Sequence, residues 1–133
     1  MQIDPSLHSV ADNYKLLTNL VVPRPIAWVT SVNAGGVVNL APFSFFNAVG
    51  ANPLYIIISI GLNDAGETKD TAKNILASGE FVVNLVTEEL FDAMNISAAD
   101  FPEGESELAA ANLHAAPSVK IREPLIKSHM AAH

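Results

Sequence analysis

The sequence predicts a mostly β domain with inserted helices. Residues 25–33 form a run of β-forming side chains, and a Gly-containing turn at 34–36 leads to a returning strand at 37–41. Residues 54–60 are almost continuously apolar, which is typical of a strand that is buried on both faces. Because the predicted helices do not alternate regularly with the strands, a mostly antiparallel sheet is favoured over a βαβ sheet.

The remaining elements follow from local patterns. Apolar residues at helical spacing predict a helix over residues 10–21, which Pro23 ends. A second helix is expected over residues 69–78, with Asp70 or Thr71 as its N-cap. The other expected elements are a strand at 80–86, a helix at 87–95, a loop at 98–105, a short helix at 107–113 and a strand at 118–122 that resumes after Pro124.

Composition limits the classes of function. The 133 residues carry a net charge of −7, and 50% of them are hydrophobic, so we expect one folded domain over residues 1–133. The excess of acidic residues disfavours nucleic acid and anionic membranes as partners. The chain has no cysteine, and its histidines lack metal-ligand spacing, so we expect no metal site. With neither a signal-peptide pattern nor a membrane-length apolar run, a cytoplasmic location is expected.

Polar residues interrupt the apolar sequence that follows the returning strand. They include Asn39, Ser44 and Asn47, and Pro42 stands among them. Since Pro42 has no backbone donor, it belongs at a sheet edge, a bulge or the end of a strand. The polar side chains either bond the local backbone or face a ligand, and the residues alone leave both interpretations open.

Basic residues accompany the start of the helix predicted at 69–78. Lys69 and Lys73 flank a helix N-terminus, where free N–H groups and a partial positive charge suit a phosphate. The alternative is an ordinary capped surface helix. Arg24, which stands between two prolines, is either a solvated charge at a strand end or a further anion contact.

No constellation of catalytic side chains is evident. The sequence has no G-x-S-x-G elbow, no Walker motif and no G-x-G-x-x-G fingerprint. Most acidic residues fall on predicted helix surfaces or loops. We therefore assign no catalytic residue, and expect either a binding module or an enzyme whose cofactor carries the chemistry.

Four segments, RPIAWVTSVN, NLAPFSFFN, KDTAKNI and EFVVNLV, occur in an order that resembles the flavin reductase-like family. The resemblance covers residues 14–125 and implies an FMN-binding split β-barrel. Family members continue beyond the point that matches Leu125, whereas residues 127–133 form a tail that is atypical of the family. We therefore expect a barrel that is incomplete at its C-terminus, in a chain that is not a stable monomer.

The resemblance also implies a cofactor site. The end of the first strand would line the flavin, the segment after the returning strand would hold the ring and the ribityl chain, and the helix start would hold the phosphate. The implied cofactor-binding residues are Arg24, Thr30, Ser31, Val32, Asn33, Asn39, Ala41, Pro42, Phe43, Ser44, Asn47, Lys69, Asp70, Thr71 and Asn74.

The activity that the resemblance implies is hydride transfer from NADH or NADPH to flavin, with the protein supplying position rather than an acid or a base. A homodimer, and a flavin-dependent monooxygenase as the recipient of reduced flavin, are the implied partners. Two alternatives stay open: an FMN-binding electron-transfer protein without substantial reductase activity, and a fragment that binds nothing. The choice between NADH and NADPH cannot be read from the residues.

Overall fold

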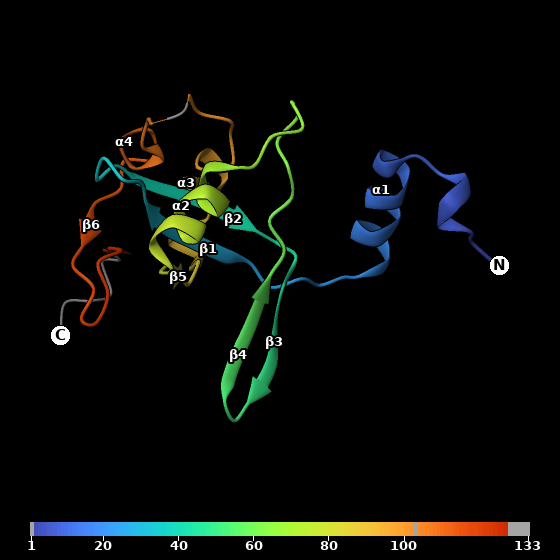
Figure 1. Cartoon of the computed structure of the whole chain (residues 1–133), viewed down its shortest axis with the longest axis horizontal. Helices are drawn as coiled ribbons and strands as arrows, with labels where there is room; N and C mark the ends of the chain where they lie inside the picture. The colour runs from blue at the N-terminus through green and yellow to red at the C-terminus, as the bar shows by residue number, and fades with distance from the viewer. Residues whose placement is uncertain (1, 103, 128–133) are drawn as a thin grey trace.

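The computed structural model describes residues 2–102 and 104–127 (Figure 1). Its centre is a three-stranded antiparallel sheet in the order β2-β1-β5. The strands are β1 (Ala27–Val32), β2 (Val38–Phe43) and β5 (Val82–Asn84). The strand, turn and returning strand predicted for this region are thus confirmed, with β5 shorter than expected.

Strand β1 is almost fully buried, and its side chains alternate between two cores. On one face Trp28 packs with Leu40 and Met94, which we call the tryptophan core. On the other face Val29 packs with Phe43, which we call the valine core. Successive side chains of a strand point to opposite faces, so a central strand with a helix on each side needs apolar residues at nearly every position.

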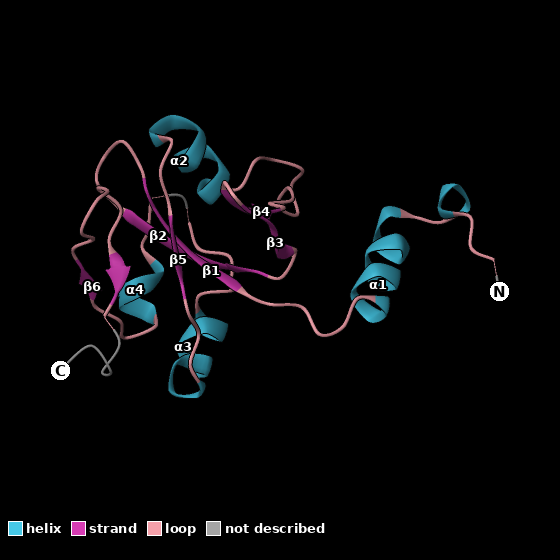
Figure 2. Cartoon of the chain, turned by 90° about the horizontal axis from the view of Figure 1, so that it is seen from below, coloured by secondary structure: helices cyan, strands magenta, loops and turns pink. Residues whose placement is uncertain are grey.

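Two helices cover opposite faces of this sheet (Figure 2). Helix α2 (Asp70–Ser78) contributes Ile75 to the valine core. Helix α3 (Phe91–Ile96) packs on the tryptophan core, and Ser97 follows it directly. The indole Nε1 of Trp28 donates a hydrogen bond of 2.9 Å to Ser97 Oγ, so the polar atom of this buried ring is satisfied.

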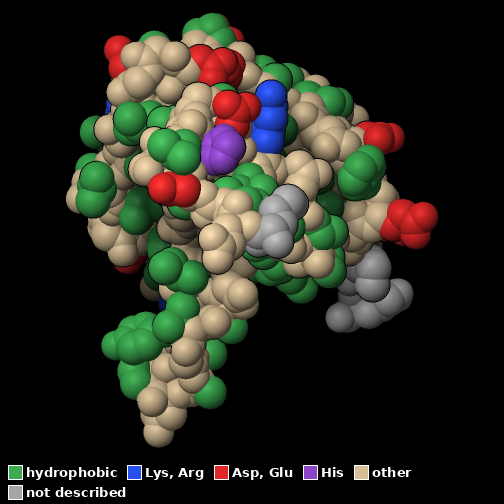
Figure 3. All heavy atoms as spheres, turned by 90° about the vertical axis from the view of Figure 1, so that its right-hand side faces the viewer, with side chains coloured by type: hydrophobic (Ala, Val, Ile, Leu, Met, Phe, Trp, Pro, Cys, Tyr) green, Lys and Arg blue, Asp and Glu red, His purple; other side chains and the backbone are tan. Residues whose placement is uncertain are grey.

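The predicted burial of residues 54–60 on both faces is wrong. Strands β3 (Phe46–Ala51) and β4 (Leu54–Ile58) form a hairpin that projects from the body of the molecule (Figure 1). Leu54 is 81% exposed and Tyr55 is 60% exposed. Apolar side chains are visible along the projection in Figure 3. An apolar run shows that a strand has surface to cover, but it does not say whether the same chain covers it.

The helix predicted at 10–21 is confirmed as α1 (Val10–Leu20), which follows a short 3-10 helix at Pro5–Leu7. None of the α1 residues is buried, and the helix lies apart from the sheet (Figure 1). The helix predicted at 87–95 is divided into a 3-10 turn at Glu88–Leu90 and α3. The helix predicted at 107–113 is shorter, as α4 (Glu107–Ala110). None of the described helices is long and apolar enough to cross a membrane.

The strand predicted at 118–122 is wrong, whereas its expected continuation after Pro124 is confirmed as β7 (Leu125–Ile126). Residues 119–123 form bends, and β7 pairs with β6 (Ala115–Ala116). Alternation of polar and apolar side chains favours a strand only where a neighbouring backbone is available for pairing. Of residues 127–133, which were expected to be atypical of the family, Lys127 alone belongs to the described residues.

Candidate cofactor site

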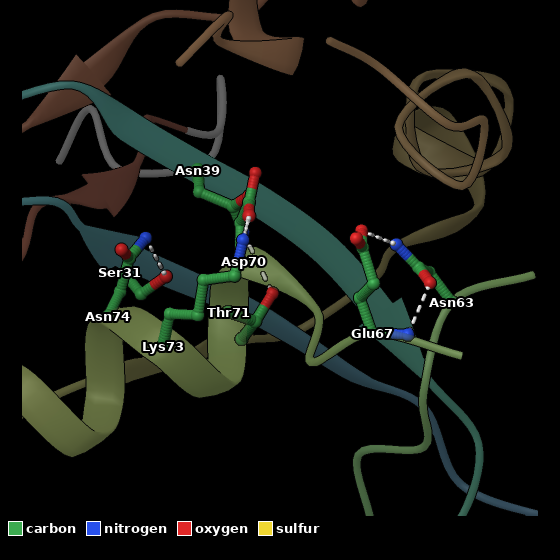
Figure 4. Close-up of polar contacts among 8 residues, drawn as sticks. All are labelled: Ser31, Asn39, Asn63, Glu67, Asp70, Thr71, Lys73 and Asn74. Carbon is green, nitrogen blue, oxygen red and sulfur yellow. Dashed lines mark hydrogen bonds and ion pairs between the residues drawn. The ribbon is translucent and has the colours of Figure 1, made fainter. Parts of the chain in front are cut away.

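Strand β2 and the start of α2 lie side by side at the edge of the sheet. Asn39 Nδ2 donates a hydrogen bond of 2.8 Å to Thr71 Oγ1, joining positions 32 residues apart in the sequence (Figure 4). Thr71 is 2% exposed. Pro42 lies on the same strand, and β2 is an edge strand of its sheet, as the missing backbone donor of proline predicts.

These two segments line a pocket of about 130 Å³. It brings together seven of the predicted cofactor residues, four from β2 and three from the start of α2. The lining consists of Asn39, Ala41, Pro42, Phe43, Asn63, Thr68, Lys69, Asp70, Thr71, residues 97–101 and Glu107. Asn63 is fixed in its loop because its side-chain oxygen accepts a 2.8 Å hydrogen bond from the Glu67 backbone N–H (Figure 4).

The start of α2 has no side-chain cap. The prediction that Asp70 or Thr71 is the N-cap is wrong: Lys69 occupies that position and makes no capping hydrogen bond. The Thr71 hydroxyl accepts the Asn39 amide, and Asp70 pairs with Lys73 at 3.0 Å (Figure 4). A helix start without a cap side chain keeps N–H groups and a partial positive charge available to an anion.

A second pocket, of about 210 Å³, shares Asn39 and Asp70 with the first. Its lining includes the predicted residues Asn33 and Asn74. The Asn33 side chain closes the turn after β1, where its Oδ1 accepts a 2.9 Å hydrogen bond from the Val37 N–H. The predicted residue Val32 lines a third pocket of about 200 Å³, together with Asn33.

Thr30 and Ser31 are both 0% exposed. Asn84 Nδ2 donates to Thr30 Oγ1 at 2.6 Å, and Asn74 Nδ2 donates to Ser31 Oγ at 3.2 Å. These hydroxyls therefore tie β1 to β5 and to α2 from within the protein. Asn84 was missed by sequence reasoning, although an amide side chain inside the apolar segment 81–86 was a signal that it has a buried partner.

Six predicted residues stand outside the linings of the two pockets at β2 and α2: Thr30, Ser31 and Val32 on β1, and Arg24, Ser44 and Asn47. Arg24 Nη1 donates to the backbone carbonyls of Thr18 at 2.6 Å and Val21 at 2.7 Å, where α1 ends. Arg24 Nε donates to Ser44 Oγ at 3.3 Å. Asn47 is exposed on β3, and its oxygen accepts a hydrogen bond from the next backbone N–H. The Arg24 guanidinium thus has three protein acceptors, in place of full solvation.

Glu107, the first residue of α4, is a pocket residue that sequence reasoning did not single out. It is 6% exposed, and its Oε2 accepts a hydrogen bond of 2.8 Å from the Leu40 N–H of β2. Burial raises the pKa of Glu107, the Leu40 hydrogen bond opposes that rise, and the charge of Asp70 adds to it. An acid in the first turn of a helix is so common that its position in the sequence does not distinguish it.

Known proteins resemble this chain in sequence and in structure. Residues 19–133 match the family model described as flavin reductase like domain. The chain is 46% identical over 114 residues to an uncharacterised protein of Aquifex aeolicus, a match that covers 86% of this chain and 58% of that protein. Nitrilotriacetate monooxygenase component B from Bacillus cereus has a similar structure, with a TM-score of 0.90, 46% identity and coverage of 96% of this chain and 62% of that one.

A Shewanella frigidimarina structure with a split barrel domain matches with a TM-score of 0.78 at 18% identity, over 96% of this chain and 64% of that one. The expected split-barrel fold is confirmed by these likenesses. The chain spans 58%, 62% and 64% of the lengths of these three proteins. With a family model that matches residues 19–133, the chain belongs to the flavin reductase-like family.

Proposed function

We propose that the chain binds FMN and acts as a flavin reductase with NADH or NADPH as hydride donor. The observation that carries the proposal is the meeting of β2 with the start of α2 at one pocket. The family resemblance implies that the first segment contacts the flavin and that the second holds its phosphate. The Asn39–Thr71 hydrogen bond of 2.8 Å holds them together.

The residues at the helix start suit a phosphate monoester. Lys69 offers a cation, the Thr71 hydroxyl offers a hydrogen-bonding group, and the uncapped turn offers backbone N–H groups. Sites that enclose a whole small ligand measure roughly 300–1,000 Å³. The pocket of about 130 Å³ is smaller, so it suits the phosphate end rather than the complete cofactor.

Pro42 and Phe43 supply the apolar part of the lining on the β2 side. Flavin, when bound, supplies the hydride-accepting ring, and the chain contributes position and exclusion of water. The buried Thr30 and Ser31 hydroxyls act indirectly in this proposal, because they fix the strand and the helix that carry the lining residues.

The likeness to a monooxygenase component B supports a role in supplying reduced flavin to a partner monooxygenase. We extend the proposal to a cytoplasmic location. We also propose a homodimer, since the exposed apolar hairpin β3–β4 offers a surface that a second copy can cover.

Two measurements test the proposal. Purified protein mixed with FMN and then separated from free flavin is expected to keep the flavin absorbance bands. It is also expected to oxidise NADH or NADPH in steady state when FMN is added, and comparison of the two donors identifies the preferred one. Retained flavin without such oxidation would favour the electron-transfer alternative, whereas protein that retains no flavin would contradict the proposal.

A further inference from the structure

The charges that line the pocket at the start of α2 do not favour a phosphate as they stand. Lys69 is the one lysine in the described lining, whereas Asp70, Asp100 and Glu107 are carboxylates. A phosphate monoester carries about −1.5 to −2 at neutral pH. The partial positive charge of the helix start, about half a unit, does not balance that excess. A phosphate therefore binds more favourably when one carboxylate of the lining is neutralised.

Glu107 is the carboxylate for which that removal is easiest. Asp70 has a cationic partner in Lys73 at 3.0 Å, and Asp100 is exposed, so water stabilises its charge. Glu107 is 6% exposed and faces the like charge of Asp70. Strand β2, against which α4 packs, carries no ionisable side chain. The other charged residues in the described lining of this pocket are thus Lys69 and Asp70 on the α2 side and Asp100 on the preceding segment. Lys73 pairs with Asp70, and Glu105 lines the adjoining pocket with Lys73.

We propose that Glu107 is a specificity-determining residue of the pocket, which takes up one proton from solvent when a phosphate monoester binds beside Lys69 and Thr71. The proton bonds to Oε1, while Oε2 goes on accepting the Leu40 N–H at 2.8 Å. A protonated carboxyl is also a donor, so the same step that removes repulsion adds a hydrogen bond toward the anion. This inference rests on the proposed FMN site and identifies the group that senses the phosphate charge.

The experiment compares FMN with riboflavin, which lacks the phosphate, by calorimetry in buffers of different ionisation enthalpy at about pH 8. At that pH free phosphate is a dianion, since its second pKa is about 6. Wild-type protein is expected to take up more protons with FMN than with riboflavin. Glu107→Gln imitates the protonated carboxyl in shape and donors. It is expected to lose the additional uptake and to bind FMN about tenfold more tightly, with riboflavin unchanged, because the wild-type carboxylate must first take up a proton that the amide does not need.

The exposed Glu89 provides a matched control, because Glu89→Gln removes the same charge from the surface and is expected to keep the additional uptake. Equal proton uptake with the two flavins in wild-type protein would overturn the inference without any variant. Additional uptake that persists in Glu107→Gln would also overturn it, since the proton would then reside on the phosphate. Absence of binding by either flavin would overturn both this inference and the proposed function, so the two failures are distinguishable.

Discussion

The Asn39 amide donates a 2.8 Å hydrogen bond to the Thr71 hydroxyl, and this contact joins the edge strand β2 to the first turn of α2. The two residues are 32 positions apart in the sequence, and each comes from a different motif of the family. Because Thr71 is 2% exposed, the contact is sheltered from water and holds the helix start at a defined place beside β2.

The first prediction concerns the phosphate. Thr71→Ala combined with Lys69→Ala is expected to weaken FMN binding far more than riboflavin binding, because the phosphate is the only group that distinguishes the two ligands. Hydrogen bonds to charged groups contribute about 1.5–3 kcal/mol each. Flavin fluorescence titration measures both affinities. Lys120→Ala, at an exposed position outside the pocket lining, is the charge control. Equal losses for the two flavins would show that this helix start does not hold the phosphate.

The second prediction concerns the buried pair of Ser31 and Asn74, in which Asn74 Nδ2 donates a hydrogen bond of 3.2 Å to Ser31 Oγ. Asn74→Ala leaves the Ser31 hydroxyl without this donor and is expected to lower the free energy of unfolding by about 1–3 kcal/mol. Adding Ser31→Ala to that variant is expected to cost less than the sum of the single changes, because the two groups satisfy each other. Urea unfolding measures all four proteins, and strict additivity would contradict the coupling.

Much of the fold could be predicted from local patterns. Strands β1 and β2 have β-forming sequences and are joined by a short turn, so they pair with each other, and α2 has a helix-forming sequence. The hairpin β3–β4 could not, since its apolar residues satisfy the pattern of a buried strand whether or not this chain covers them. Alternation at residues 118–122 failed for a related reason: periodicity describes a strand's faces but not its pairing partner.

The candidate site could be predicted where motif residues line the pocket directly, as Asn39 and Lys69 do. It was not predictable where a residue acts through burial. Ser31 looked like a ligand contact in the sequence, yet its hydroxyl is enclosed by the protein. Glu107 was not singled out in the sequence, yet it reaches the backbone of β2. Solvent exposure depends on tertiary packing, and the spacing of polar residues along a chain does not encode it.

The third prediction concerns Arg24, whose Nη1 atom bonds two carbonyls at the end of α1. Helix ends have unpaired carbonyl groups, and a cationic donor stabilises them. Arg24→Ala is expected to accelerate amide hydrogen exchange in the last turn of α1, whereas amides of β1 keep their protection. Arg24→Lys is expected to give a partial effect, since a lysine cannot reproduce the planar fork. Unchanged exchange in α1 for the alanine variant would contradict this capping role.

The fourth prediction follows from the raised pKa of Glu107, for which burial is the main cause. The folded chain then holds this proton more strongly than the unfolded chain does. The corresponding stability is fully present below the usual pKa of 4.5 and is lost as pH rises through the folded-state pKa. Glu107→Gln has no such dependence. Its free energy of unfolding relative to wild type is therefore expected to increase as pH is raised, in a urea series at several pH values; a constant difference would contradict the assignment.

The last prediction concerns the projecting hairpin. Tyr55 is 60% exposed and Ile57 is 56% exposed, and they stand two apart on β4, so they share one face of the strand. Removal of apolar surface from water favours association by about 25 cal/mol for each square ångström, before the entropic costs of association are subtracted. We expect light scattering over a dilution series to show dimers that dissociate at low concentration. Tyr55→Ser with Ile57→Thr should shift this transition to higher concentration, since both changes reduce the apolar area of that face. Val119→Ser, at a position that is 96% exposed but outside the hairpin, is the matched control and should leave the transition in place. A monomer at every concentration, or an equal shift in the control, would mean that the hairpin is not the surface through which two copies associate.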